Sequence, residues 1–162
     1  MKKLLYIIIS TLCLSLTYTG ISYADESTPY GKASVEKTDY SPQKVLYDVA
    51  ATDMATFEHV LDRASYLNTV YNANPFEASI VMVLHGDEIP FFAIANADKY
   101  HDLMQRAKSL TQSGPIEFRM CRIAAQGHGF EPEQINGFVK IVPMADAEII
   151  RLQQEEGYAY MQ

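Results

Sequence analysis

Short apolar segments alternate along this chain with longer amphipathic ones, and this alternation constrains the fold more than any other feature. The short segments have the length of β-strands, and the first two are apolar almost throughout, as in strands that are covered on both faces. The longer segments carry apolar residues at helical spacing. The expected strands are residues 44–50, 78–84, 116–121 and 138–143, with a terminal edge strand at 158–161.

The order of these elements predicts a three-layer α/β fold, with a mostly parallel sheet of about five strands and helices on both faces. Thr52 or Asp53 is expected to cap the first helix, Asn96 the second and Asp146 the last. Gly157 is expected to end the last helix, since glycine is common just after a helix C-terminus.

The start of the chain has the three parts of a secretory signal peptide. A basic start at Lys2 and Lys3 precedes an apolar run over residues 4–16, and Ser22 and Ala24 supply the small residues of a cleavage site. The run is too short and too early for an ordinary membrane-spanning helix, although an uncleaved anchor is the alternative. We therefore expect export to the periplasm, with no membrane attachment after cleavage.

The chain accordingly divides into three parts. Residues 1–24 are the expected signal peptide. Residues 25–43 are polar and lack apolar periodicity, which predicts a flexible arm. Residues 44–162 are long enough for a single domain with its own core. The net charge is −7, and its scattered acidic pattern argues against nucleic acid and anionic membrane surfaces as partners.

Several sequence motifs of known chemistry are absent. The chain has no Cys-x-x-Cys pair, which excludes a thioredoxin-type dithiol, and no Gly-x-Gly-x-x-Gly, Walker or Gly-x-Ser-x-Gly sequence. No cofactor is therefore expected. Four scattered carboxylates are interpreted as helix caps and turn residues: Asp48, Asp53, Asp87 and Glu88.

Cys121 is the most informative single residue. The chain has two cysteines, and Cys13 would leave with the signal peptide, so Cys121 would have no partner for an intramolecular disulfide. In an oxidising compartment such a cysteine is buried and inert, paired with another chain, or reactive. Cys121 ends an expected strand, and open α/β sheets bind ligands at that end. A reactive thiol and a buried structural cysteine are both open at this point.

Three residues are candidates for a pocket around Cys121. Arg119 would share its face of the strand, because side chains alternate along a strand. His85 ends the preceding strand and would either relay a proton to the thiol or satisfy the turn at Gly86. His128 lies in the glycine-rich loop after Cys121, as a pocket residue or as a plain surface residue. Cys121, His85 and His128 together would suit a soft metal, although their spacing matches no closed motif.

Five features follow one another in a fixed order from residue 44 to the C-terminus. They are the strand 44–50, the strand end Val83-Leu84-His85-Gly86, Cys121 on its strand, the strand Phe138-Val-Lys-Ile-Val-Pro143 and the terminal segment 150–160. In order and spacing they resemble the DsrE/DsrF-like family of sulfur-relay proteins, which have the YchN-like fold. The resemblance implies a compact α/β domain with a mostly parallel sheet, assembled as a homo-oligomer, a trimer or a hexamer.

The resemblance also implies a function. In the best understood members of that family, a strand-end cysteine accepts sulfane sulfur as a persulfide and passes it on. This role maps onto Cys121 alone. Together with the expected export, it implies a periplasmic sulfur carrier, transferase-like at most, which exchanges sulfur with donor and acceptor proteins or small thiols. The alternatives are a non-catalytic oligomeric binding module with a structural cysteine, or a soft-metal-binding protein.

Overall fold

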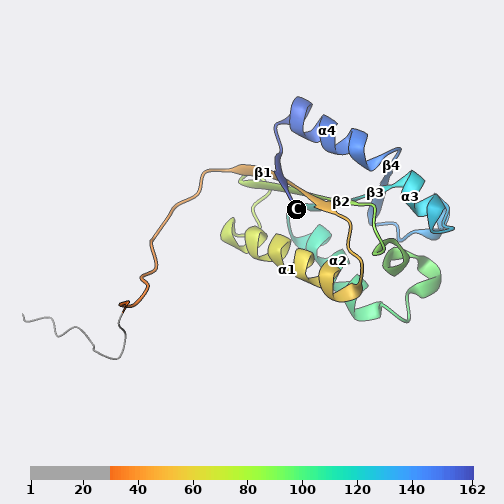
Figure 1. Ribbon diagram of the computed structural model, residues 1–162, viewed down its shortest axis with the longest axis horizontal. Coiled ribbons are helices and arrows are strands. Elements are labelled where there is room, and N and C mark those ends of the chain that lie inside the picture. The colour runs from red at the N-terminus through yellow and green to blue at the C-terminus, as the bar shows by residue number, and fades with distance from the viewer. Residues whose placement is uncertain (1–29) are drawn as a thin grey trace, which may run out of the picture. The chain divides into compact units, whose positions relative to one another are not determined.

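A five-stranded sheet forms the centre of the protein (Figure 1). The computed structural model describes residues 30–162, and the expected signal peptide lies outside the described residues. The strand order is β4-β3-β2-β1-β5, and each neighbouring pair is parallel. This confirms the predicted α/β class. The strands are β1 (Gln43–Val49), β2 (Ala78–Leu84), β3 (Ile116–Cys121), β4 (Val139–Val142) and β5 (Ala159–Met161).

Helices cover both faces of the sheet. Figure 1 shows α1 and α2 on one face and α4 on the other. Three short 3₁₀ helices lie in the connections, and residues 30–42 form no helix or strand. The helices are α1 (Met54–Val70), α2 (His101–Ser113), α3 (Arg122–Gly127) and α4 (Ala145–Glu156), and the 3₁₀ helices are η1 (Ile89–Phe92), η2 (Ile94–Asn96) and η3 (Pro132–Gln134).

The larger part of the core lies between the sheet and helices α1 and α2. Its centre is a cluster of phenylalanines, in which the Phe92 ring lies 5.5 Å from Phe57, 5.6 Å from Phe118 and 6.0 Å from Phe138. Phe57, Phe92 and Phe118 are fully buried. Tilted and edge-on aromatic pairs at these distances add stabilisation beyond the area that they bury.

A smaller core cluster lies on the α4 face, and it contains Cys121. Val81 and Val83 of β2 and Leu46 of β1 pack there against Ile149 of α4. Helix α4 contacts β1 and β2 on this face, and the part of the face over β3 and β4 carries charged side chains, described below. At the other end of α4, the Tyr158 hydroxyl lies 2.6 Å from the Ser79 hydroxyl.

Two of the four expected helix ends are confirmed. Asp53 caps α1, because its Oδ1 accepts a hydrogen bond of 2.8 Å from the Thr56 backbone N–H. Gly157 ends α4 in the left-handed conformation, with φ of 74°.

The other two expected caps are wrong. Asn96 does not cap α2, which begins at His101, because the apolar segment before it forms 3₁₀ turns and the Asn96 amide donates to the Pro90 carbonyl. Asp146 lies inside the first turn of α4 and the N-cap is Met144. A carboxylate in the first turn still interacts favourably with the helix dipole, so an aspartate at position 146 stabilises α4 without acting as its cap.

No helix within residues 30–162 is both long enough and apolar enough to cross a bilayer.

Candidate functional site

The candidate site lies where β2 and β3 end. Leu84 of β2 pairs with Met120 of β3 in the parallel ladder. One residue further on, His85 and Cys121 therefore stand side by side at the C-terminal edge of the sheet. Side chains alternate along strands, so His85 follows Val83 and Cys121 follows Arg119 onto the α4 face. The predicted neighbourhood of Cys121 and His85 is thus present.

Cys121 is buried but not sealed. Its exposed fraction is 5%, and it packs in the smaller core cluster with Val83 and Ala145. An open cavity of about 200 Å³ reaches it. The wall of the cavity is mostly apolar, with His85 and one acid as its polar members. The lining residues are His85, Cys121, Ile123, Ala124, Met144, Ala145 and Asp146.

His85 is held from the side away from Cys121. Its Nε2 lies 2.5 Å from Oδ1 of Asp48 on β1, and both side chains are partly buried. The other carboxylate oxygen of Asp48 accepts a hydrogen bond from the Tyr160 hydroxyl of β5. That hydrogen bond raises the pKa of Tyr160, since it favours the protonated phenol. The histidine ring is therefore fixed by a carboxylate that is itself held by a phenol.

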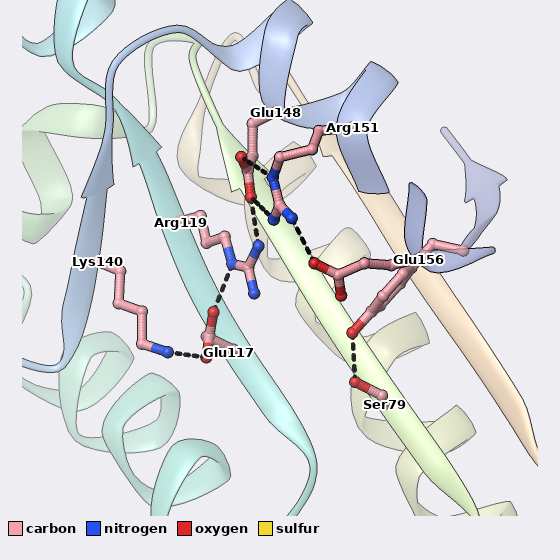
Figure 2. A network of polar contacts seen from close by, with 8 residues as sticks. Ser79, Glu117, Arg119, Lys140, Glu148, Arg151 and Glu156 are labelled. Carbon is pink, nitrogen blue, oxygen red and sulfur yellow. Dashed lines mark hydrogen bonds and ion pairs between the residues drawn. The ribbon is translucent and has the colours of Figure 1, made fainter. Parts of the chain in front are cut away.

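Arg119 is engaged elsewhere. Figure 2 shows its guanidinium between Glu117 of its own strand and Glu148 of α4, both of which accept hydrogen bonds from it. Arg119 is not among the residues that line the cavity beside Cys121. The hydrogen bond from Arg151, followed by that from Arg119, outweighs burial and lowers the pKa of Glu148. Arg119 thus helps to attach α4 to the sheet.

His128 is also placed away from the cavity. Its Nε2 lies 3.7 Å from Oδ1 of Asp87, in the loop that follows β2. Within residues 30–162, no three histidine, cysteine, aspartate or glutamate side chains come together in a way that would hold a metal ion. The arrangement of Cys121, His85 and His128 therefore gives no support to the soft-metal alternative.

Glu88 ties together the two loops beside the site. Its side chain is fully buried, Oε2 accepts from the Ala51 backbone N–H and Oε1 from the Gly86 backbone N–H, each at 2.9 Å. Burial raises the pKa of Glu88, against the lowering effect of these hydrogen bonds. A Cβ on Gly86 would come within 2.6 Å of the Ala50 backbone, so only glycine fits where the loops meet. The turn that follows His85 is thus fixed by the hydrogen bonds to Glu88.

Three residues beside the site were not anticipated from the sequence: Asp48, Glu88 and Tyr160. Asp48 and Glu88 were interpreted as cap or turn residues. For Asp48 this is wrong, because it lies within β1 and binds His85. Glu88 does lie in the turn after β2, and its buried side chain also accepts a hydrogen bond from the Ala51 backbone. Asp48 carried a signal: it is a charged residue inside an otherwise apolar strand, where an unpaired carboxylate is costly. Tyr160 gave no such signal, because tyrosine is common in β-strands and needs no special contact at an exposed edge.

A larger cavity of about 650 Å³ lies elsewhere, between α2 and the turn that precedes β4. Met104, Lys108 and Phe138 are among its lining residues, and it does not include Cys121 or His85. Volume alone would favour it as a binding site. The smaller cavity is chemically more informative, because it joins a thiol to a histidine that is bound to a carboxylate.

Comparison with known proteins supports the fold and no more. No family model matches the chain, and no curated protein matches it. Among solved structures, the chain is similar to the protein of unknown function MTH1491 from Methanobacterium thermoautotrophicum, with a TM-score of 0.57 and 18% sequence identity. The match covers 74% of this chain and 97% of the other. At this identity the likeness concerns the arrangement of the strands and helices.

Proposed function

We propose that this chain is a sulfur carrier of the DsrE/DsrF-like type, with Cys121 as the residue that holds sulfane sulfur as a persulfide. The observation that carries the proposal is the shared cavity: Cys121 and His85 both line it, at the C-terminal edge of a parallel sheet. The proposal includes export to the periplasm, from the signal-like residues 1–24, and a trimeric or hexameric assembly, from the family resemblance.

The chemistry needs a thiolate and a sulfane donor, such as a persulfide R–S–SH. The Cys121 thiolate attacks the outer sulfur of the donor and forms a new S–S bond, while the donor S–S bond breaks and its electron pair leaves on the thiolate RS⁻. The proton that Cys121 has lost returns to RS⁻, so the products are the Cys121 persulfide and RSH. No net oxidation occurs. An acceptor thiolate takes the outer sulfur by the same exchange.

The cavity suits a small donor group. Liquid water occupies about 30 Å³ per molecule, so about 200 Å³ holds a few non-hydrogen atoms beyond the sulfur being transferred. Ile123 and Met144 supply an apolar rim, and Asp146 places a carboxylate at its edge. A low-molecular-weight persulfide, or the cysteine side chain of a partner protein, fits this space.

The proposal is tested by mass spectrometry at the peptide that contains Cys121. The native full-length protein, incubated with inorganic polysulfide, is expected to gain the mass of added sulfur at Cys121 and to lose it when a small thiol is added. The Cys121→Ser variant is expected to gain nothing at this peptide. Modification of the wild type only after unfolding would contradict the proposal, and the low exposure of Cys121 would then mark a structural cysteine in a binding module.

A further inference from the structure

Four side chains that lie in four neighbouring strands, or directly after one of them, follow one another in a row across the α4 face. Cys121 ends β3, His85 follows β2, Asp48 belongs to β1 and Tyr160 to β5. These strands are consecutive in the sheet. From the row we infer that Asp48 and Tyr160 are positioning residues, which orient His85 and stabilise its protonated form so that Cys121 is held as a thiolate. This inference rests on the proposed function and adds two residues to it.

The register explains how the row arises. Leu46 of β1 pairs with Tyr160 of β5, and Asp48 lies two residues beyond Leu46 on the same face. The Tyr160 side chain thus reaches diagonally along the sheet to Asp48. Since Leu46 packs in the smaller core cluster with Cys121, this shared face is the α4 face. The row contains residues of four separate segments of the chain, so it exists only when the four strands are next to one another in the sheet.

The contact between His85 and Asp48 determines which ring nitrogen of His85 can accept the proton of the Cys121 thiol. A carboxylate only accepts, so Nε2 of His85 carries a hydrogen toward Asp48. In the neutral ring, Nδ1 then has the lone pair that takes a proton. When the S–H bond of Cys121 breaks, the proton forms an N–H bond on Nδ1. The resulting imidazolium is stabilised by the Asp48 carboxylate, and its positive charge stabilises the thiolate.

The groups whose charge can act on His85 are mainly acidic, as this step requires. Asp48 faces it from β1, Asp146 of α4 lines the same cavity, and Glu88 interacts with it electrostatically from the loop after β2. The Tyr160 hydroxyl carries no charge and acts only by holding Asp48 in place through its hydrogen bond. The Arg119 guanidinium on β3 is engaged by Glu117 and Glu148. Acidic groups therefore predominate around the imidazole.

The test is the pH dependence of Cys121 alkylation by iodoacetamide, followed on the peptide that contains Cys121 in the native full-length protein. Asp48→Asn keeps an oxygen that accepts from Nε2 but removes the charge. It is expected to move the midpoint of the pH–rate profile upward by about one unit, which lowers the rate about tenfold at pH values below the midpoint. Tyr160→Phe is expected to shift the profile in the same direction and by less. Tyr66→Phe, which changes an exposed side chain of α1, is the matched control, and no shift is expected for it.

A double-mutant cycle separates positioning from a merely structural role. In a His85→Gln background, Asp48→Asn is expected to have no further effect on the profile, because its effect passes through the imidazole. A loosened fold would instead raise the alkylation rate at all pH values without moving the midpoint, and that result, or an unchanged profile in Asp48→Asn, would overturn the inference. Because iodoacetamide supplies no sulfur, a protein that shows the shift but forms no persulfide would refute the carrier function alone.

Discussion

Replacement of Glu88 by alanine is expected to lower the free energy of unfolding by roughly 3 kcal/mol. A buried N–H without a partner costs about 1–3 kcal/mol, and this change leaves two N–H groups without one, the buried N–H of Ala51 and the partly buried N–H of Gly86. The loops after β1 and β2 would lose their connection at the same time. Glu88→Gln keeps one acceptor oxygen and the volume, so we expect a loss of only about 1 kcal/mol. Urea denaturation gives both values.

The same variants test the protonation of Glu88. Its pKa in the folded protein is raised by burial above the ordinary value of 4.5. A carboxyl with a raised folded pKa contributes stability that is fully present below the unfolded pKa and is lost as the pH rises through the folded pKa. The stability advantage of the wild type over Glu88→Gln is therefore expected to shrink as the pH rises above 4.5.

A comparison with a surface glutamate provides the control. Glu155→Ala on α4 changes an exposed residue and is expected to leave stability within about 0.5 kcal/mol of the wild type at every pH. If Glu88→Ala behaved like Glu155→Ala, the account of a buried acceptor that joins the two loops would be incorrect.

Phe118→Ala is expected to lower the free energy of unfolding by about 3–5 kcal/mol, since it removes a fully buried ring and leaves a cavity. Phe118 lies in the middle of β3, three residues before Cys121, and contacts Phe92 and Phe138. The lost packing would loosen the strand that carries the thiol. Chemical denaturation monitored by circular dichroism measures the change.

The matched control is the same substitution at an exposed site. Phe76 is 91% exposed, and Phe76→Ala is expected to change stability by less than about 0.5 kcal/mol. Equal effects of the two substitutions would mean that the phenylalanine cluster on the α1 and α2 face is not the centre of the core.

The fold followed from local patterns in the sequence. Strand β2 was predicted with its observed bounds because its apolar residues end abruptly at His85 and Gly86. The cap at Asp53 was predictable because side chain and backbone are three residues apart. The prediction that Asn96 caps a helix was wrong because Asn96 contacts a residue six positions away. Its side-chain amide donates to the Pro90 carbonyl across the 3₁₀ turns, and no helical or alternating sequence pattern predicts such turns.

The site was predictable only in part, because its contacts join residues far apart in the chain. Cys121 and His85 were chosen from their places at strand ends, and the strand order brings them together. The bond from His85 to Asp48 depends on β1 lying next to β2, and the bond from Tyr160 to Asp48 depends on β5 adding to the far side of β1. The sequence of a single segment does not determine the strand order, so the contacts of Asp48 with His85 and Tyr160 could be identified only from the assembled sheet.

The carrier account depends on whether a reagent reaches Cys121 without unfolding of the protein. The alkylation rate of Cys121 by iodoacetamide, measured at increasing urea below the unfolding transition, answers this directly. If the reagent enters through the cavity, the rate is expected to stay nearly constant across these urea concentrations. A rate that rises with urea in proportion to the unfolded fraction would show that Cys121 reacts only after unfolding, and it would contradict the account.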